Sequence, residues 1–454
     1  MTTDNPATLI TNVTIVCCDD RQRIVPRGAL LIEGGFIRRI GSEAALRRVY
    51  RGPRSGVLDG GGRLVLPGFI NAHAHLYGVF ARGMAVPGRP PRNFLEILQK
   101  LWWKLDKALD EEAVYWSAMV GLMQAIRRGT TTVIDHHASP RAVAGSLDAL
   151  WRAFARTGVR GALCYEVSDR DGPQVARQGI AENIRFLQLC RKDSAGEMRA
   201  ALFGLHASFT LTDRTLKACA EAGHAMGAGF HIHCAEDPCD NRISRSRFGR
   251  RPLERLAAAG MLNSRTILAH CIHIGDRDRD LIAGHDCLVA HNPRSNMNNA
   301  VGVADIRALM DRGITVGLGT DGVSFSQQEE ILAAFLLHKI HRGDCNFGWV
   351  ETWAAAVGGN QQFARRVFGI PGLGALVSGA PADLVLLDYF PPTPLTADSL
   401  KGHLFFGILY APVFATIIGG RVRMWGGALV GLDEEDIAHR AARSARRVWK
   451  RVQA

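Results

Sequence analysis

Two histidines, His73 and His75, stand two residues apart in the run NAHAH. If this run is a strand, both side chains point to the same face, because side chains alternate along a strand. Two imidazoles on one face supply half of a site for a transition metal. Such pairs also arise by chance, so the interpretation depends on groups that follow later in the chain.

Two later apolar runs end in groups that can complete this site. His233 occurs in HIHCAE and Asp321 in GTDG. Together with His73 and His75 they give three imidazoles and one carboxylate. This set suits Zn²⁺, with Fe²⁺ as the alternative, and leaves room for a water molecule. We therefore expect one divalent metal ion on these four residues.

The same runs carry groups for acid–base chemistry. A metal would lower the pKa of its bound water towards about 7, so that hydroxide is available at neutral pH. Asp321 would also receive the proton of that water, and Glu236 of HIHCAE would protonate the substrate as general acid. His270, in LAHC, would orient the water or polarise the attacked centre, with core packing as its alternative role.

Substrate contacts are expected near the ends of the same runs. The candidates are His206, His137, Arg82, Trp102 and Asn296. Trp102 or its neighbour Trp103 would stack on a flat heterocycle, although core packing is the commoner role of such a side chain.

The other candidates also have alternatives. Alternation along a strand allows only one of His136 and His137 to face the interior, and we favour His137. Arg82 has a solvated or helix-capping role as an equal alternative. Asn296 would bind substrate or hold its own loop.

The elements that position these groups are short apolar runs separated by long helical segments. Eight such runs occupy 69–76, 131–137, 161–167, 201–207, 227–236, 265–273, 287–293 and 314–322. This alternation over residues 67–377 predicts an α/β fold with a (β/α)₈ TIM-type barrel. Most of the runs end in polar residues, as expected at the edge where barrel enzymes keep their chemistry.

The two ends of the chain have a different texture, with short β-rich runs and Gly turns. Residues 1–66 and 378–430 are predicted to form one small β-sandwich together, into which the barrel is inserted. Residues 431–454 predict an amphipathic helix with acids first and bases last, docked on the surface rather than anchored in a membrane.

Composition narrows the classes of function. The 454 residues are 47% apolar and 22% charged, which is typical of a globular chain with one large or two moderate domains. No apolar stretch is long enough to span a bilayer and the start lacks a basic signal-peptide region, so we expect a cytoplasmic protein. The ten cysteines contain no CxxC pair and are expected to be reduced thiols.

The net charge of +12 permits an acidic partner. No nucleic-acid reader motif accompanies this charge, so nucleic-acid binding is not expected. Attraction of an anionic small substrate is the more plausible consequence.

The runs PGFINAHAH, HIHCAE, LAHC, HNPRSN and GTDG, in this order, resemble the amidohydrolase superfamily, in its triazine-hydrolase-like deaminase branch. The runs NFLEILQKLWWKLDKALDEE, VIDHHASP and NPRSNMNN are similar to SsnA-type aminohydrolases, with 8-oxoguanine deaminase and adenosine-type deaminases as more distant kin. The resemblance covers essentially the whole chain. It implies the metal ligands and catalytic residues named above, and homodimers or higher homo-oligomers.

Two details of the fourth run refine this resemblance. It ends in His206 and contains no Lys, which argues against a carboxylated-lysine bridge and for a single metal. The segment reads HASFT where similar proteins commonly have HAPFT, so the local substrate loop differs.

The function expected is hydrolytic removal of an amino group from a purine- or pyrimidine-like heterocycle. The alternative is hydrolysis of a ring C–N bond, or displacement of sulfide or chloride, on an imidazolone, thiohydantoin or triazine-like substrate. A catalytically inactive barrel used as an interaction scaffold would lack metal ligands, whereas all four are present.

Overall fold

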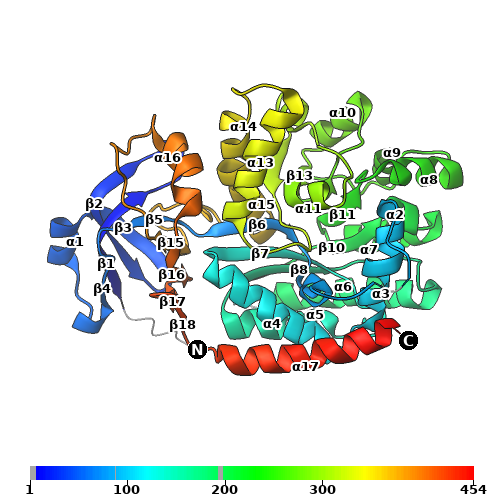
Figure 1. The fold of residues 1–454 in the computed structure, drawn as a ribbon, viewed down its shortest axis with the longest axis horizontal. Helices are drawn as coiled ribbons and strands as arrows, with labels where there is room; N and C mark the ends of the chain where they lie inside the picture. The colour runs from blue at the N-terminus through cyan, green and yellow to red at the C-terminus, as the bar shows by residue number, and fades with distance from the viewer. Residues whose placement is uncertain (1–6, 87, 193–197, 454) are drawn as a thin grey trace.

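The computed structural model describes residues 7–86, 88–192 and 198–453. A sheet built from both ends of the chain lies beside a larger body of parallel strands and helices (Figure 1). The first six residues of the predicted sandwich segment lie outside the described part.

The sheet from the chain ends has nine strands in the order β18-β17-β16-β15-β5-β1-β2-β3, with β4 beside β1. Their bounds are β1 Thr8–Val16, β2 Ile24–Glu33, β3 Phe36–Ser42, β4 Val57–Asp59, β5 Leu64–Pro67, β15 Leu384–Leu387, β16 Val413–Ile418, β17 Arg421–Trp425 and β18 Ala428–Leu429. The two ends meet where β5 pairs antiparallel with β15. Alternate residues such as Ile10, Leu30 and Leu384 pack on one side of this sheet as a separate apolar core.

The larger body contains two sheets of parallel strands, β6-β7-β8-β9 and β10-β11-β12-β13-β14. The bounds are β6 Phe69–Ala74, β7 Thr130–His137, β8 Arg160–Tyr165, β9 Arg199–Ala201, β10 Phe203–Ala207, β11 Phe230–Cys234, β12 Ile267–His270, β13 Leu288–His291 and β14 Thr315–Leu318. Parallel bridges join Ala74 to Asp321 and Val167 to Leu205, and so link the two sheets at both junctions. Each of the eight apolar runs contains an observed strand, and the fourth run spans the break between β9 and β10.

Helices follow the parallel strands and lie on their outer side (Figure 1). The α-helices are α1 Glu43–Val49, α2 Phe94–Ile97, α3 Trp103–Ala108, α4 Glu111–Arg127, α5 Ser146–Thr157, α6 Pro173–Lys192, α7 Asp213–Ala225, α8 Pro238–Phe248, α9 Pro252–Ala258, α10 Asp276–Gly284, α11 Pro293–Asn298, α12 Ile306–Met310, α13 Gln327–Arg342, α14 Trp349–Trp353, α15 Asn360–Phe368, α16 Leu400–Phe406 and α17 Glu434–Gln453. Single-turn π-helices occur at Leu98–Trp102 and Ala354–Gly359. Side-chain caps begin several helices, as where Asp110 accepts from the Ala113 amide at the start of α4.

One apolar cluster takes residues from strands all along both parallel sheets. Ala72 of β6, Ile134 of β7, Ile267 of β12 and Leu288 of β13 belong to it, together with Phe363 of α15. Strands distant in sheet order can share a cluster only if their side chains meet between them. Apolar packing thus fills the interior, and polar groups gather at the carboxyl ends of the strands.

A buried ion pair joins the body of parallel strands to the sheet from the chain ends. Arg160, the first residue of β8, donates from Nε to Asp383 Oδ2 at 2.9 Å, and both side chains are almost fully buried. Asp383 also accepts from the Gly419 amide at 2.7 Å. This contact fixes how the two parts of the molecule meet.

The last helix, α17, runs along the surface beneath α4 (Figure 1). Its buried residues Ile437, Ala441, Val448 and Val452 form a stripe at helical spacing. The Trp449 indole donates to the Phe80 carbonyl at 2.7 Å. No helix in the described part of the chain is long and apolar enough to cross a membrane.

Candidate active site

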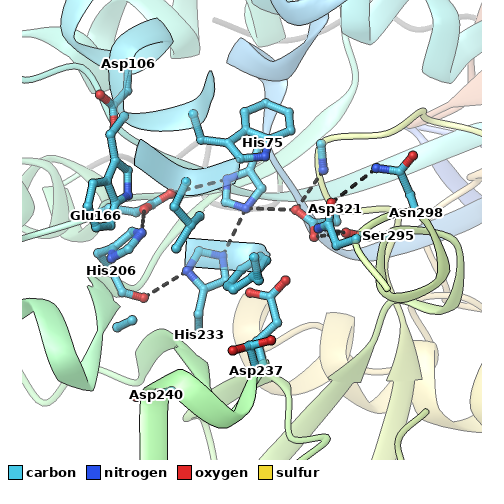
Figure 2. A pocket seen from close by; sticks show the side chains of 18 of the residues that line it. His75, Asp106, Glu166, His206, His233, Asp237, Asp240, Ser295, Asn298 and Asp321 are labelled. Carbon is cyan, nitrogen blue, oxygen red and sulfur yellow. Dashed lines mark hydrogen bonds and ion pairs between the residues drawn. The ribbon is translucent and has the colours of Figure 1, made fainter. Parts of the chain in front are cut away.

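The four predicted metal-binding residues converge at the carboxyl ends of β6, β11 and β14. His75 Nε2 lies 3.1 Å from His233 Nε2 and 3.1 Å from Asp321 Oδ1. His73 Nε2 lies 3.9 Å from the same carboxylate oxygen. Figure 2 shows His75 between His233 and Asp321, with the side chains aimed at one point.

Each imidazole is oriented through its second nitrogen. His75 Nδ1 donates to the His136 carbonyl at 2.5 Å, and His233 Nδ1 donates to the His206 carbonyl at 2.9 Å. His73 Nδ1 is 2.9 Å from His231 Nε2. These contacts leave Nε2 of all three rings facing the centre, which is the arrangement of metal-binding histidines.

Asp321 is held by its own loop. Ser295 donates to Asp321 Oδ2 at 2.5 Å, and the Gly322 amide donates to Oδ1 at 2.8 Å. The backbone of Asp321 has a φ of 53°, in the left-handed region that side chains other than Gly rarely adopt. Such strain costs about 1–3 kcal/mol and concentrates at functional sites.

Charges in the cluster compensate one another. Burial lowers the pKa of His75, but its hydrogen bond with Asp321 and the nearby Glu166 outweigh this and raise the pKa well above its usual value. Burial raises the pKa of Asp321, yet the contact with His75 brings it well below its usual range. Burial, reinforced by its charged neighbours, keeps the pKa of His73 well below its normal value.

The donor set fits a divalent cation. His73 Nε2 is fully buried and has no hydrogen-bond partner among the described residues. His73, His75, His136 and His233 form one group whose ligand atoms lie within 4.8 Å of one another, and His73 shares a second such group with His270 and Asp321. A buried nitrogen left without a partner is costly unless something binds it.

Two further predicted residues lie beside this cluster. His270 Nε2 is 3.5 Å from Glu236 Oε2 and 3.7 Å from Asp321 Oδ2. His270 Nδ1 donates to Asn296 Oδ1 at 2.8 Å. Burial, and then the charge of Asp321, raises the pKa of Glu236 well above its usual value, which favours the protonated acid.

A cavity of about 740 Å³, open solvent at its mouth included, opens above the cluster. His75, His233, Glu236 and Asp321 line its floor, and aromatic side chains line its walls. Apolar walls above a polar floor are the usual lining of a small-molecule site.

Two of the five substrate-contact candidates line this cavity, namely His206 and Trp102. Trp103, the first residue of α3 after the π-helical turn at Leu98–Trp102, lines it as well. His206 Nδ1 is 3.0 Å from Thr210 Oγ1, which leaves Nε2 directed towards the cavity side.

The structure differs from the expectation at the other three candidates. His137 Nε2 is 2.9 Å from Ser139 Oγ, outside the cavity, while His136 stacks on His231 among the site histidines. Arg82 is exposed and donates to Gln124. Asn296 is fully buried against His270, so it can act on substrate only through that ring.

Several residues at the site were missed from the sequence. His231 stands two before His233, so alternation could have placed it on the same face. Ser295 follows its strand closely, and Glu166 comes directly after β8, at the edge where polar groups were expected. Asp106, on α3, carried no signal of this kind.

The chain is similar in sequence to a known protein family over most of its length. Residues 64–423 match the model of the amidohydrolase family. The chain belongs to the amidohydrolase family. This amidohydrolase is 30% identical over 448 residues to the 5-methylthioadenosine/S-adenosylhomocysteine deaminase of Pelotomaculum thermopropionicum, covering 98% of this chain and 99% of that protein.

Solved structures share the fold of this amidohydrolase. An adenosine deaminase of Xanthomonas campestris with bound zinc superposes with a TM-score of 0.83 at 21% identity, covering 98% of both chains. The atrazine chlorohydrolase of Arthrobacter aurescens complexed with zinc has a TM-score of 0.80 at 21% identity, covering 96% of this chain and 100% of that one. This amidohydrolase is a metal-dependent hydrolase acting on non-peptide carbon–nitrogen bonds.

Proposed function

We propose that this amidohydrolase is a deaminase that removes the amino group from a purine-like heterocycle by hydrolysis, with adenine nucleosides as the first substrates to test. The observation that carries the proposal is the position of Glu236, whose pKa is raised by burial, 3.5 Å from His270, with the Asp321 carboxylate 3.7 Å from the same His270 nitrogen. A proton donor and a proton acceptor thus face the same point at the floor of the cavity. The deaminase relatives supply the substrate class.

His73, His75, His233 and Asp321 would hold a single divalent ion, with Zn²⁺ favoured over Fe²⁺ by the imidazole-rich set. When bound, the ion lowers the pKa of water in contact with it to about 7 and supplies hydroxide at neutral pH. The single-metal assignment is supported by His206, which stands where a bridging lysine would be needed.

The chain's own residues then move the protons. Asp321, fixed by Ser295, receives the proton of the attacking water. Glu236 gives its proton to the ring nitrogen beside the attacked carbon, and His270, held by Asn296, orients the attacking water by accepting a hydrogen bond at Nε2. The new C–O bond forms, the amino group accepts the proton held by Asp321, the C–N bond breaks and ammonia leaves. Glu236 recovers its proton from the new hydroxyl group.

Walls of the cavity would hold the heterocycle. Trp102 and Trp103 offer flat faces for stacking, and His206 offers a ring nitrogen for hydrogen bonding. His137, Arg82 and Asn296 are not proposed as direct contacts, since none of them lines the cavity.

The test is ammonia release from adenosine, 5′-deoxyadenosine, 5′-methylthioadenosine, guanine and cytosine, measured on the metal-loaded enzyme. We expect turnover of at least one adenine nucleoside. A second panel of thiohydantoins and chlorotriazines tests the alternative, hydrolysis of a ring C–N bond or displacement of sulfide or chloride. The atrazine chlorohydrolase, which shares the fold, is the reason for including chlorotriazines. Turnover of the second panel with silence on the first would replace the proposal.

For the architecture, we propose a (β/α)₈ barrel over residues 67–377, inserted in a β-sandwich of residues 1–66 and 378–430, with residues 431–454 as a docked helix. The two bridges between the parallel sheets support closure of the barrel. The separate apolar core on the nine-stranded sheet supports the sandwich.

We also propose a homodimer or higher homo-oligomer, as the family resemblance implies. Exposed apolar side chains on neighbouring helices support a protein contact, among them Ile340 of α13, Val350 of α14 and Phe406 of α16. Light scattering after size-exclusion chromatography tests this, and a monomeric mass at micromolar concentration would contradict it.

A further inference from the structure

One end of the cavity is polar and lies away from Asp321. Figure 2 shows Asp106, Glu166 and His206 on one side of His75, and Asp321 with Ser295 on the other. Trp103, Asp106 and Glu166 all line the cavity there. Each has a buried polar atom, Nε1, Oδ1 and Oε1 respectively, without a hydrogen-bond partner in the described part of the protein.

Glu166 is the least satisfied of these groups. Its residue is 2% exposed. Oε1 is 3.3 Å from His75 Nδ1, but that nitrogen carries one proton at most when it binds metal through Nε2, and it already donates to the His136 carbonyl at 2.5 Å. Oε2 is 4.0 Å from His206 Nε2, beyond hydrogen-bond distance. The carboxylate therefore has acceptor positions left for a ligand.

The neighbouring Asp106 differs, because its charge is compensated. Arg170 donates to Asp106 Oδ2 at 2.9 Å, and both side chains are buried. The ion pairs of Glu166 within the described residues are with histidines only. Glu166 is thus a buried carboxylate at the wall of a ligand cavity, with the charge of Arg170 nearby but no direct ion pair to Lys or Arg among the described residues.

Carboxyl side chains are common in the cavity lining, and basic ones other than histidine are not found among its described residues. Six carboxyl side chains line it, those of Asp106, Glu166, Glu236, Asp237, Asp240 and Asp321. Among the described residues that line it, none is Lys or Arg. The net charge of +12 therefore lies elsewhere on the protein, and the expected attraction of an anionic substrate finds no cationic partner in the cavity.

We propose that Glu166 determines specificity by accepting hydrogen bonds from a neutral or cationic group of the substrate, remote from the attacked carbon, and that the cavity excludes phosphate- and carboxylate-bearing substrates. A donor group satisfies the free oxygen of Glu166, whereas an anion brings no donor for it and finds no Lys or Arg among the described residues that line the cavity. This inference rests on the proposed deaminase function. In an adenine nucleoside, the 5′ substituent lies farthest from the amino-bearing carbon and is the position to vary.

The experiment compares kcat/KM of the metal-loaded enzyme for 5′-amino-5′-deoxyadenosine, adenosine, 5′-deoxyadenosine and adenosine 5′-monophosphate. We expect the amine to exceed the 5′-deoxy compound at least tenfold, and the phosphate to fall at least a hundredfold below adenosine. Glu166→Gln should reduce the preference for the amine over 5′-deoxyadenosine to less than threefold, while the metal content, measured by elemental analysis, stays that of the unaltered enzyme. Glu221→Gln, an exposed carboxylate on α7, is the matched control and should leave every ratio as it is.

The outcomes separate the two claims. Silence on all four compounds overturns the proposed function, and this inference with it. Equal turnover of the phosphate and adenosine by the unaltered enzyme overturns the inference alone. An equal loss on all substrates, or loss of metal, in Glu166→Gln would show that Glu166 only positions His75, and would also overturn it.

Discussion

At the scale of residues, the site depends on the hydrogen-bond partners that orient the converging side chains as much as on those side chains themselves. His75 and His233 are turned by backbone carbonyls, and Asp321 is turned by Ser295. His270, with a φ of 74°, and Asp321 both sit in left-handed backbone at the ends of their strands. The fold thus holds strained residues where the chemistry takes place, which is a mark of function rather than of packing.

Replacing Glu236 tests the proton donor directly. Glu236→Gln keeps the size of the side chain but removes the acidic proton, so we expect kcat to fall by about 10²–10⁴-fold. Metal content, measured by elemental analysis, should not change, because Glu236 is outside the ligand set. Full activity in this variant would show that another group protonates the substrate.

At the scale of elements, the carboxyl ends of parallel strands bring together residues that are far apart in sequence. Helical elements then build the cavity over them. The segment in which the π-helical turn at Leu98–Trp102 leads into α3 is one such element. Here Trp102 and Trp103 both line the cavity.

The docking of α17 carries the second prediction. Trp449→Phe keeps most of the ring packing but loses the hydrogen bond to the Phe80 carbonyl, next to the site loop after β6. We expect a loss of about 1 kcal/mol in the free energy of unfolding, measured by denaturant titration. Trp116→Phe on α4 is the matched control, and an equal loss there would assign the effect to ring size.

At the scale of the whole molecule, several polar contacts join the sheet from the chain ends to the body of parallel strands, and the buried ion pair of Arg160 with Asp383 is one of them. Arg160→Met would leave the Asp383 carboxylate buried without its partner. We expect a destabilisation of about 3–5 kcal/mol, read from denaturant unfolding. Arg152→Met removes one side of an exposed pair with Glu111 and should cost at most about 1 kcal/mol. Similar losses in the free energy of unfolding in the two variants would show that the buried pair stabilises the fold no more than the exposed pair does.

Metal removal should act on the whole fold as well as on activity. A ligand that binds only the native state stabilises it, by about 2.7 kcal/mol at a concentration a hundred times its Kd. Chelation should therefore abolish ammonia release and lower the melting temperature together. Adding back Zn²⁺ or Fe²⁺ separately should restore both, and the ion that restores full turnover identifies the working metal. An unchanged melting temperature after complete loss of metal would contradict this linkage.

The sequence alone determined the α/β class and the strands, since apolar runs with polar ends recur at the spacing of βα units. It also singled out His73, His75, His233, Glu236 and Asp321, because HxH parity and strand-end positions are local properties. The roles of these residues remain proposals. The structure adds that their side chains meet at one point.

Tertiary structure alone decided the rest, because it depends on contacts between segments distant in the chain. Whether His136 or His137 faces the site follows from the packing of β7 against β11, which no local pattern records. Asn296 turned out to hold His270, and the described lining of the cavity has carboxyl side chains but no Lys or Arg, although the net charge of the chain is positive. Net charge is a sum over the surface, whereas the field that a substrate meets is set by the few groups that fold around it.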